Sequence, residues 1–223
     1  MSIGVTVPPD GRVVVGLLAG CLALVLPGIA AGQEAGGERP EILPPDEEFD
    51  LALSAAPEHL EDGAAVWVLG PDGYELAREG TNGFACIVNR DHPRNLKPTC
   101  YDSEGAATIL PKVVFVGELM LRGLPIAAIQ DSVRAGFESG RFRAPARPGV
   151  AYMLSDRIRT YNPRTREYGT FPPHLMFYAP NLTNDDIGTD WEAIREHPWL
   201  PRVAYQGPHG FLVVVIGDAA SRD

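Results

Sequence analysis

Residues 64–79 read AAVWVLGPDGYELARE, two strand-forming runs on either side of a turn. The runs 64–69 and 74–79 contain β-branched and aromatic residues, which favour strands. Between them, Pro71 and Gly73 supply the dihedral angles of a tight turn. The stretch therefore predicts a β-hairpin. A third strand over 84–88 (FACIV) extends this prediction to an antiparallel meander over residues 64–89.

Two longer helices are expected after the meander. Residues 111–122 and 125–139 each begin with proline and are followed by glycine, the usual asymmetry of helix ends. The second segment places apolar side chains on one face, at Ile126, Ile129, Val133 and Phe137. We expect the two helices to form a helical hairpin that packs on one face of the sheet.

Shorter segments complete the predicted fold. Strands are expected over 150–154, 174–179 and 211–216, and short helices over 50–56 and 191–197. Because strands and helices occur in separate runs, the predicted class is α+β with a largely antiparallel sheet.

The N-terminus carries an apolar run over residues 13–31, VVVGLLAGCLALVLPGIAA. Arg12 precedes this run, and small residues end it, which predicts a secretory signal peptide over residues 1–32. Two alternatives stay open, a lipoprotein anchored through Cys21 and an uncleaved membrane anchor. With the signal cleaved, we expect a secreted or periplasmic protein that has no transmembrane span.

The net charge of −10 is unevenly distributed. Acidic residues are concentrated over positions 33–62, where Arg39 is the only basic residue. Residues 33–48 combine this charge with glycine and proline, which predicts a disordered acidic linker. A single α+β domain is then expected over residues 49–223. The acidic balance argues against nucleic acid as a partner.

Apart from Cys21, the chain contains two cysteines, Cys86 and Cys100. In an oxidising compartment we expect them to form a disulfide, the alternative being two unpaired thiols. The bond would restrict the unfolded chain by closing a loop, and the loss of chain entropy would stabilise the fold by about 3 kcal/mol.

Sequence motifs give little sign of catalysis. The chain has no Gly-x-Ser-x-Gly stretch, no glycine-rich phosphate loop and no histidine pair at metal-binding spacing, so we expect neither a metal nor a cofactor. His174 is the strongest catalytic candidate, and a hydrolase site near His174, Tyr178 and Asn181 is the alternative function. We expect instead that the ring of His174 is half-buried and bonds a backbone carbonyl.

Arginines are concentrated over residues 134–166, and the proline-stiffened loop after the second helix holds Arg141, Arg143 and Arg147. Forked guanidinium groups suit carboxylates and phosphates, so these three residues are the candidate binding site for an anionic envelope ligand. The alternative is a solvated basic face. We also expect the acidic linker to contact the segment 134–166 weakly at low salt.

Three stretches of the sequence are GTNGFAC over 80–86, CYDSEGA over 100–106 and PHLMFYAP over 173–180. They resemble segments of an uncharacterised family of exported bacterial proteins, and the resemblance covers residues 64–216. It implies export and identifies no substrate or site. The predicted function is therefore that of an exported envelope protein with a non-enzymatic binding role.

Overall fold

The computed structural model of the chain describes residues 36–216. Contacts group these residues into one compact unit. The main elements in chain order are α1 (Pro45–Leu53), α2 (Glu58–Glu61), β1 (Ala65–Gly70), β2 (Gly73–Arg78), β3 (Ala85–Asn89), β4 (Lys97–Tyr101), α3 (Ser103–Thr108), α4 (Leu110–Leu121), α5 (Ile126–Glu138), β5 (Val150–Met153), β6 (Thr160–Asn162), β7 (Glu167–Gly169), β8 (His174–Tyr178), η1 (Asp185–Ile187), α6 (Trp191–Glu196), β9 (Arg202–Ala204) and β10 (Phe211–Val215).

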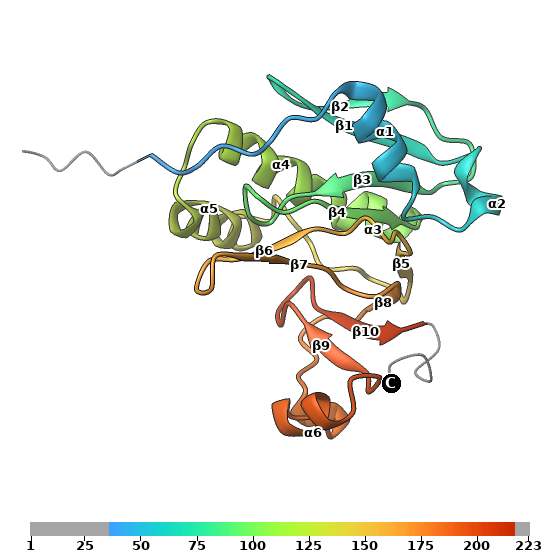
Figure 1. Ribbon diagram of the computed structural model, residues 1–223, viewed down its shortest axis with the longest axis vertical. Helices are drawn as coiled ribbons and strands as arrows, with labels where there is room; N and C mark the ends of the chain where they lie inside the picture. The colour runs from blue at the N-terminus through green and yellow to red at the C-terminus, as the bar shows by residue number, and fades with distance from the viewer. Residues whose placement is uncertain (1–35, 217–223) are drawn as a thin grey trace, which may run out of the picture. The chain divides into compact units, whose positions relative to one another are not determined.

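The centre of the fold is an eight-stranded sheet in the order β2-β1-β3-β4-β5-β8-β10-β9. Neighbouring strands are antiparallel except β1 and β3, which are parallel. Strands β6 and β7 form a separate hairpin beside this sheet (Figure 1). The prediction of an α+β fold with a largely antiparallel sheet is confirmed.

The first hairpin is as predicted, because β1 and β2 pair antiparallel around Pro71 and Asp72. The predicted meander is wrong, since β3 pairs with β1 and not with β2. The connecting loop returns to the start of β1, where the Ala65 N–H donates to the Phe84 carbonyl. Strand β3 is buried on both faces, whereas half of the β2 residues are exposed and only Tyr74 is buried. The interior place in the sheet therefore goes to β3, and β2 becomes an edge strand.

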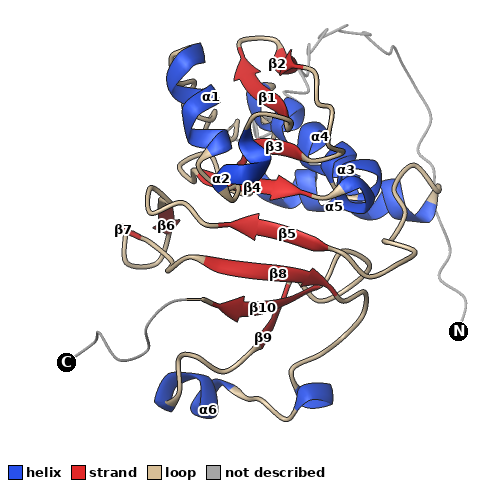
Figure 2. Cartoon of the chain, turned by 90° about the vertical axis from the view of Figure 1, so that its right-hand side faces the viewer, coloured by secondary structure: helices blue, strands red, loops and turns tan. Residues whose placement is uncertain are grey.

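The two faces of the sheet are covered by different helices (Figure 2). Helix α1 lies on one face, over β1, β3 and β4, and helices α3 and α4 lie on the other. Successive strand residues alternate between the two cores: Val66 and Val88 pack with α1, and Leu69 and Ile87 pack with α4. Helix α5 packs on α4, so the predicted helical hairpin is confirmed.

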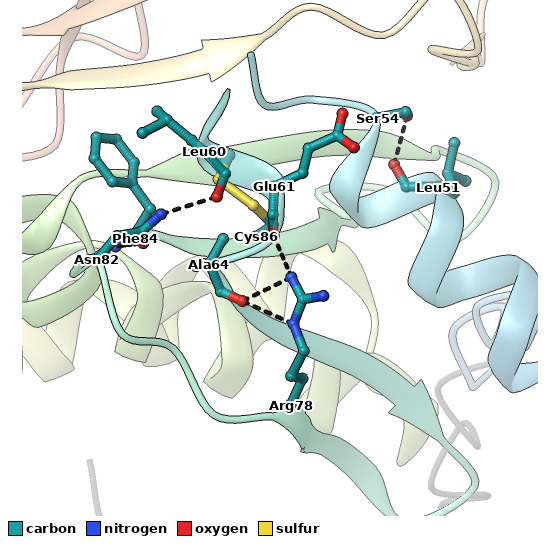
Figure 3. The surroundings of a disulfide bond; sticks show 10 residues. Leu51, Ser54, Leu60, Glu61, Ala64, Arg78, Asn82, Phe84 and Cys86 are labelled. Atoms are coloured by element: carbon teal, nitrogen blue, oxygen red, sulfur yellow. Dashed lines mark hydrogen bonds between the residues drawn. A yellow bond between two sulfur atoms is a disulfide. The ribbon is translucent and has the colours of Figure 1, made fainter. Parts of the chain in front are cut away.

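Cys86 and Cys100 lie directly opposite each other on β3 and β4 and form a disulfide. Both residues are fully buried beneath α1, which confirms the predicted bond. Nearby, the Arg78 guanidinium donates from Nε and Nη2 to the Ala64 carbonyl, at 3.1 and 2.9 Å (Figure 3). These bonds fix Ala64, the residue before β1, to strand β2. Ala64 also packs in the same buried cluster as Cys86 and Cys100.

The expected disordered linker does not extend to residue 48. Residues 36–44 run along the domain, and α1 begins at Pro45, before the expected boundary at residue 49. Pro40 and Leu43 are buried, and the Glu48 carboxylate is fully buried against Arg90. These contacts offset the low apolar content that predicted disorder. The expected signal peptide over residues 1–32 and the remaining linker residues 33–35 lie outside the described residues.

Strand β4 was not predicted from the sequence, although it lies at the centre of the sheet. Its sequence, KPTCY, contains Pro98, a residue that is rare inside a sheet. Pro98 is opposite Val88 on β3, and β4 pairs with β5 only through Cys100 and Tyr101. The proline thus lies where the pairing with β5 has ended, so no hydrogen bond to that strand is lost.

Candidate functional site

A small pocket of about 280 Å³ lies along helix α4. Three elements contribute to it besides α4: β1 provides Trp67, α3 provides Ala106 and the loop after α5 provides Arg141. The α4 residues that line it include Pro111, Val114, Phe115 and Glu118. The walls are mainly apolar, and the two charged groups are Glu118 and Arg141.

The sequence of α4 explains why this face remains available. Pro111, Phe115 and Glu118 are spaced four and three residues apart, so they share one face of the helix. Val113 and Gly117 lie on the face that is buried against the sheet. Gly117 is needed there because a β-carbon would collide with the ring of Tyr74. Close packing on the sheet side fixes the helix and leaves Phe115 beside the pocket.

Arg141 is held at the pocket by aromatic rings. Its guanidinium carbon lies 4.0 Å from the centroid of the Phe115 ring and 5.5 Å from that of Phe142. Phe142 is itself buried and packs edge-on against Phe137, with ring centroids 5.7 Å apart. In the described part of the chain, Arg141 makes no ion pair or side-chain hydrogen bond. Its guanidinium is therefore balanced by cation–π contacts rather than by a carboxylate among these residues.

The other two arginines of the predicted site do not join Arg141 at the pocket. Arg147 donates from Nε to Glu104 Oε2 at 2.9 Å and from Nη2 to Ser103 Oγ at 2.9 Å. The pKa of the Glu104 carboxyl is lowered first by the Ala146 N–H and then by Arg147. Arg143 is exposed, and its carbonyl accepts from His209 Nε2 at 2.8 Å. The structure therefore places one of the three predicted arginines, Arg141, at the pocket.

The residues of the alternative hydrolase site do not converge either. His174 and Tyr178 stand at opposite ends of β8, about 13 Å apart along a strand of this rise. His174 is buried, and its Nδ1 lies 2.8 Å from the Pro172 carbonyl, which confirms the expected bond to the backbone. Burial lowers the pKa of its imidazole. The ring is buried rather than half-buried.

Tyr178 and Asn181 have local structural roles. The Tyr178 hydroxyl donates to Asp102 Oδ1 at 2.8 Å, and burial together with this carboxylate raises the pKa of the phenol. Asp102 also caps α3 through the N–H groups of Glu104 and Gly105. Asn181 is exposed in the loop after β8, with a positive φ of 61°. These contacts give no nucleophile and no base to activate it.

The sequence analysis identified Arg141 and missed the other pocket residues, Trp67 and Phe115 among them. Helical spacing predicts that Phe115 shares a face with Pro111, but not which face of α4 is buried. Trp67 lies in a strand whose alternate residues face opposite helical layers, so its side chain points to the α4 side. Only the covering helices decide this placement.

Comparisons with protein-family models, curated proteins and solved structures found no match. The geometry of the pocket therefore carries the functional conclusion. Within residues 36–216 no group of three or more His, Cys, Asp or Glu side chains is placed to hold a metal. In the same residues, no helix is both long enough and apolar enough to cross a bilayer.

Proposed function

We propose that the protein is an exported, non-enzymatic binding protein that holds a small anionic ligand with an apolar body in the α4 pocket. The observation that carries this proposal is the position of Arg141, which is free of carboxylate partners among the described residues and stacked on Phe115. A forked guanidinium pairs with carboxylate or phosphate. The apolar walls then contact the rest of the ligand.

The size of the pocket limits the ligand. Small-molecule sites usually have volumes of about 300–1,000 Å³, and this pocket of about 280 Å³ is near the lower limit. A medium-chain carboxylate fits this description, with its chain along Val114 and Leu110 and its head group on Arg141. Glu118 also lines the pocket, and its carboxylate repels an anionic ligand more strongly the more negative charge the ligand carries. A singly charged ligand is therefore favoured.

The test compares octanoate with octanol, its neutral counterpart, by isothermal titration calorimetry. Arg141→Met keeps an apolar stem over Phe115 and removes the charge. Because hydrogen bonds to charged groups contribute about 1.5–3 kcal/mol, octanoate binding should weaken by about ten- to a hundredfold. Octanol binding should change by less than about twofold.

Arg143→Met is the matched control, because it removes the same charge from the same loop and Arg143 contacts His209 through its backbone. Octanoate binding to this variant should stay within about twofold of the original. Equal octanoate affinity for the Arg141 and Arg143 variants, or no binding of octanoate to the unchanged protein, would contradict the proposal.

Export has a separate test. The buried disulfide between Cys86 and Cys100 suits an oxidising compartment, and it supports the expectation drawn from the N-terminal sequence. Mass spectrometry of the native protein should find an N-terminus at Gly32 or Gln33. Recovery of Met1, or of a lipidated Cys21, would contradict cleavage at this site.

A further inference from the structure

A second pocket, of about 540 Å³, lies beneath the β6–β7 hairpin. It is separate from the α4 pocket and shares no lining residue with it. Its walls include three aromatic side chains, Tyr161, Tyr168 and Phe171. Residues with amide and hydroxyl groups, Asn162 and Thr165 among them, also line the pocket. The lining also includes two charged residues of opposite sign, Lys97 and Glu167. The number of aromatic rings and of amide and hydroxyl groups distinguishes this pocket from the α4 pocket.

The aromatic walls are held in place by the fold. Tyr161 and Tyr168 face each other across β6 and β7, with ring centroids 5.4 Å apart. The Arg94 guanidinium lies 4.6 Å from the Tyr161 ring centroid, and that of Arg159 lies 5.4 Å from Tyr168. Cation–π contacts of this kind restrain the rings before any ligand arrives. The restraint lowers the entropic cost of stacking a ligand on them.

These two arginines are fixed in turn by the segment that precedes α1. Arg94 Nε donates to Glu38 Oε1 at 2.8 Å, and Arg159 forms an ion pair with Glu41. The positive charges of Arg94 and Arg159 are therefore balanced by the carboxylates of these two glutamates. Neither guanidinium is left to attract an anionic ligand.

The floor of the pocket is formed by Asn95 and Lys97, which belong to a hydrogen-bonded network around Asp91, a residue that does not itself line the pocket. Lys97 Nζ and Asn95 Nδ2 each donate to this carboxylate, at 2.7 Å. Asn95 Oδ1 accepts from the Tyr161 N–H at 2.7 Å, which joins the floor to the hairpin. The Tyr205 hydroxyl also contacts Asp91 and lies 3.0 Å from Lys97 Nζ. The network orients the polar groups and balances the Lys97 charge.

The charge balance of this floor decides the class of ligand. Burial alone would raise the pKa of the Asp91 carboxyl, but Lys97 outweighs it and holds that pKa at about 2. Asp91 is therefore ionised at neutral pH and neutralises Lys97. An anion would gain little from such a floor, and the exposed carboxylate of Glu167, which also lines the pocket, would repel it. A neutral ligand with many hydroxyl groups, by contrast, finds donors, acceptors and aromatic rings together.

We propose that the pocket beneath the β6–β7 hairpin is a binding site for a neutral saccharide. The apolar C–H face of a sugar ring stacks on Tyr168 and Phe171, which are 57 % and 40 % exposed. Its hydroxyl groups exchange hydrogen bonds with Asn162, Thr165 and Lys97. The volume of about 540 Å³ is within the range of small-molecule sites and accommodates a short oligosaccharide.

The test uses three trisaccharides with the full chain: cellotriose and N,N′,N″-triacetylchitotriose, which are neutral, and trigalacturonate, which is anionic. Isothermal titration calorimetry should detect binding of at least one neutral trisaccharide and weaker binding of trigalacturonate. Tyr168→Ala and Phe171→Ala should each weaken the neutral ligand by about tenfold, the loss of about 1.4 kcal/mol. Both side chains are partly exposed, so neither variant should unfold the domain.

Trp191→Ala is the matched control, because Trp191 is an aromatic residue that is 78 % exposed and does not line the pocket. This variant should bind the neutral trisaccharide as the original does. Failure of both neutral trisaccharides to bind, preferential binding of trigalacturonate, or equal losses in the Tyr168 and Trp191 variants would overturn the proposal. Arg141→Met should leave saccharide binding unchanged, so this test is independent of the α4 pocket.

Discussion

Glu48 and Arg90 form a fully buried, two-pronged ion pair. Arg90 Nη1 and Nη2 donate to Glu48 Oε1 and Oε2, each at 2.6 Å. Arg90 Nη1 also donates to the Val88 carbonyl at 3.0 Å and lies 3.3 Å from the Tyr74 hydroxyl. Burial opposes the guanidinium charge, but the bonds to Glu48 outweigh it and raise the pKa of Arg90. The pair joins α1 to the end of β3.

Removing one partner of this pair should strongly destabilise the fold. Glu48→Gln keeps the shape of the side chain but leaves the Arg90 charge buried without a counter-ion. We expect a loss of about 3–5 kcal/mol in the free energy of unfolding, measured by urea denaturation. Asp50→Asn on the same helix is the control, because Asp50 is exposed, and its effect should stay below about 0.5 kcal/mol.

A double variant separates the charge effect from packing. Glu48→Leu combined with Arg90→Met replaces both charges by apolar groups, and such replacements are often neutral or stabilising. It should recover much of the stability lost in Glu48→Gln. Equal stability of Glu48→Gln and the original protein would contradict a structural role for the pair.

The disulfide gives a second stability prediction. Changing Cys86 and Cys100 together to alanine removes a link across neighbouring strands with 14 residues of sequence separation. The chain-entropy account gives a loss of about 3 kcal/mol. For a chain of this length the melting temperature should fall by roughly 6–12 °C. In the unchanged protein, both thiols should resist alkylation until a reductant is added, and free alkylation without one would contradict the bond.

Much of the fold was predictable because local signals agreed with it. The turn at Pro71 and Gly73 determines the first hairpin, and proline and glycine mark the ends of the helical pair. The position of β3 in the sheet was not predictable. Strand β3 would run in the same direction whether it paired antiparallel with β2 or parallel with β1, so chain direction does not distinguish the two arrangements. Only burial on both faces of β3 distinguishes the two positions, and that burial depends on α1 and α4. The order of residues 36–48 was also missed, because one buried ion pair and Leu43 outweigh a composition typical of disorder.

The candidate sites were harder to predict than the fold. Arg141 was predicted as a binding residue from the arginine-rich loop, and it does line a pocket. Nothing in the sequence distinguished it from Arg147, because Glu104, the partner of Arg147, lies 43 residues away along the chain. The network of Asp91, Asn95 and Lys97 is local in sequence. Its role in the second pocket depends on the β6–β7 hairpin, which brings Tyr161 against Asn95.

The contact between the acidic segment and the arginines is more selective than the sequence indicated. Glu41 pairs with Arg159 inside the segment 134–166, but Glu38 pairs with Arg94 outside it. Glu38→Gln with Glu41→Gln should free both guanidinium groups, and the protein should then elute from heparin at higher salt. Exposed ion pairs contribute about 0–1 kcal/mol each, so the domain should stay folded.

Asp46→Asn with Glu47→Gln is the control for this charge change. It removes the same two charges from the exposed first turn of α1, where neither residue forms an ion pair among the described residues. The shift in elution salt should be larger for the Glu38 and Glu41 variant. Identical shifts for the two double variants would mean that total charge, rather than the released arginines, controls binding to heparin.

His209 gives a prediction for the pH dependence of stability. It is buried, donates from Nε2 to the Arg143 carbonyl, and has no hydrogen-bond partner for Nδ1 among the described residues. The pKa of this imidazole is lowered to about 4, mainly by burial; the bond to the Arg143 carbonyl opposes the shift and the charge of Lys112 adds to it. Between about pH 6.5 and pH 4 the unfolded chain therefore binds a proton that the folded chain does not. Stability should fall as the pH falls through this window, by about 2–3 kcal/mol from this residue.

His209→Gln tests this account, because glutamine retains an N–H donor for the Arg143 carbonyl and does not titrate. The variant should lack the His209 part of the pH dependence. The difference in unfolding free energy between the original protein and the variant, measured in urea at several pH values, should thus be largest above pH 6.5 and should decrease towards pH 4. Parallel stability curves for the two proteins across this range would show that His209 titrates equally in the folded and unfolded chains.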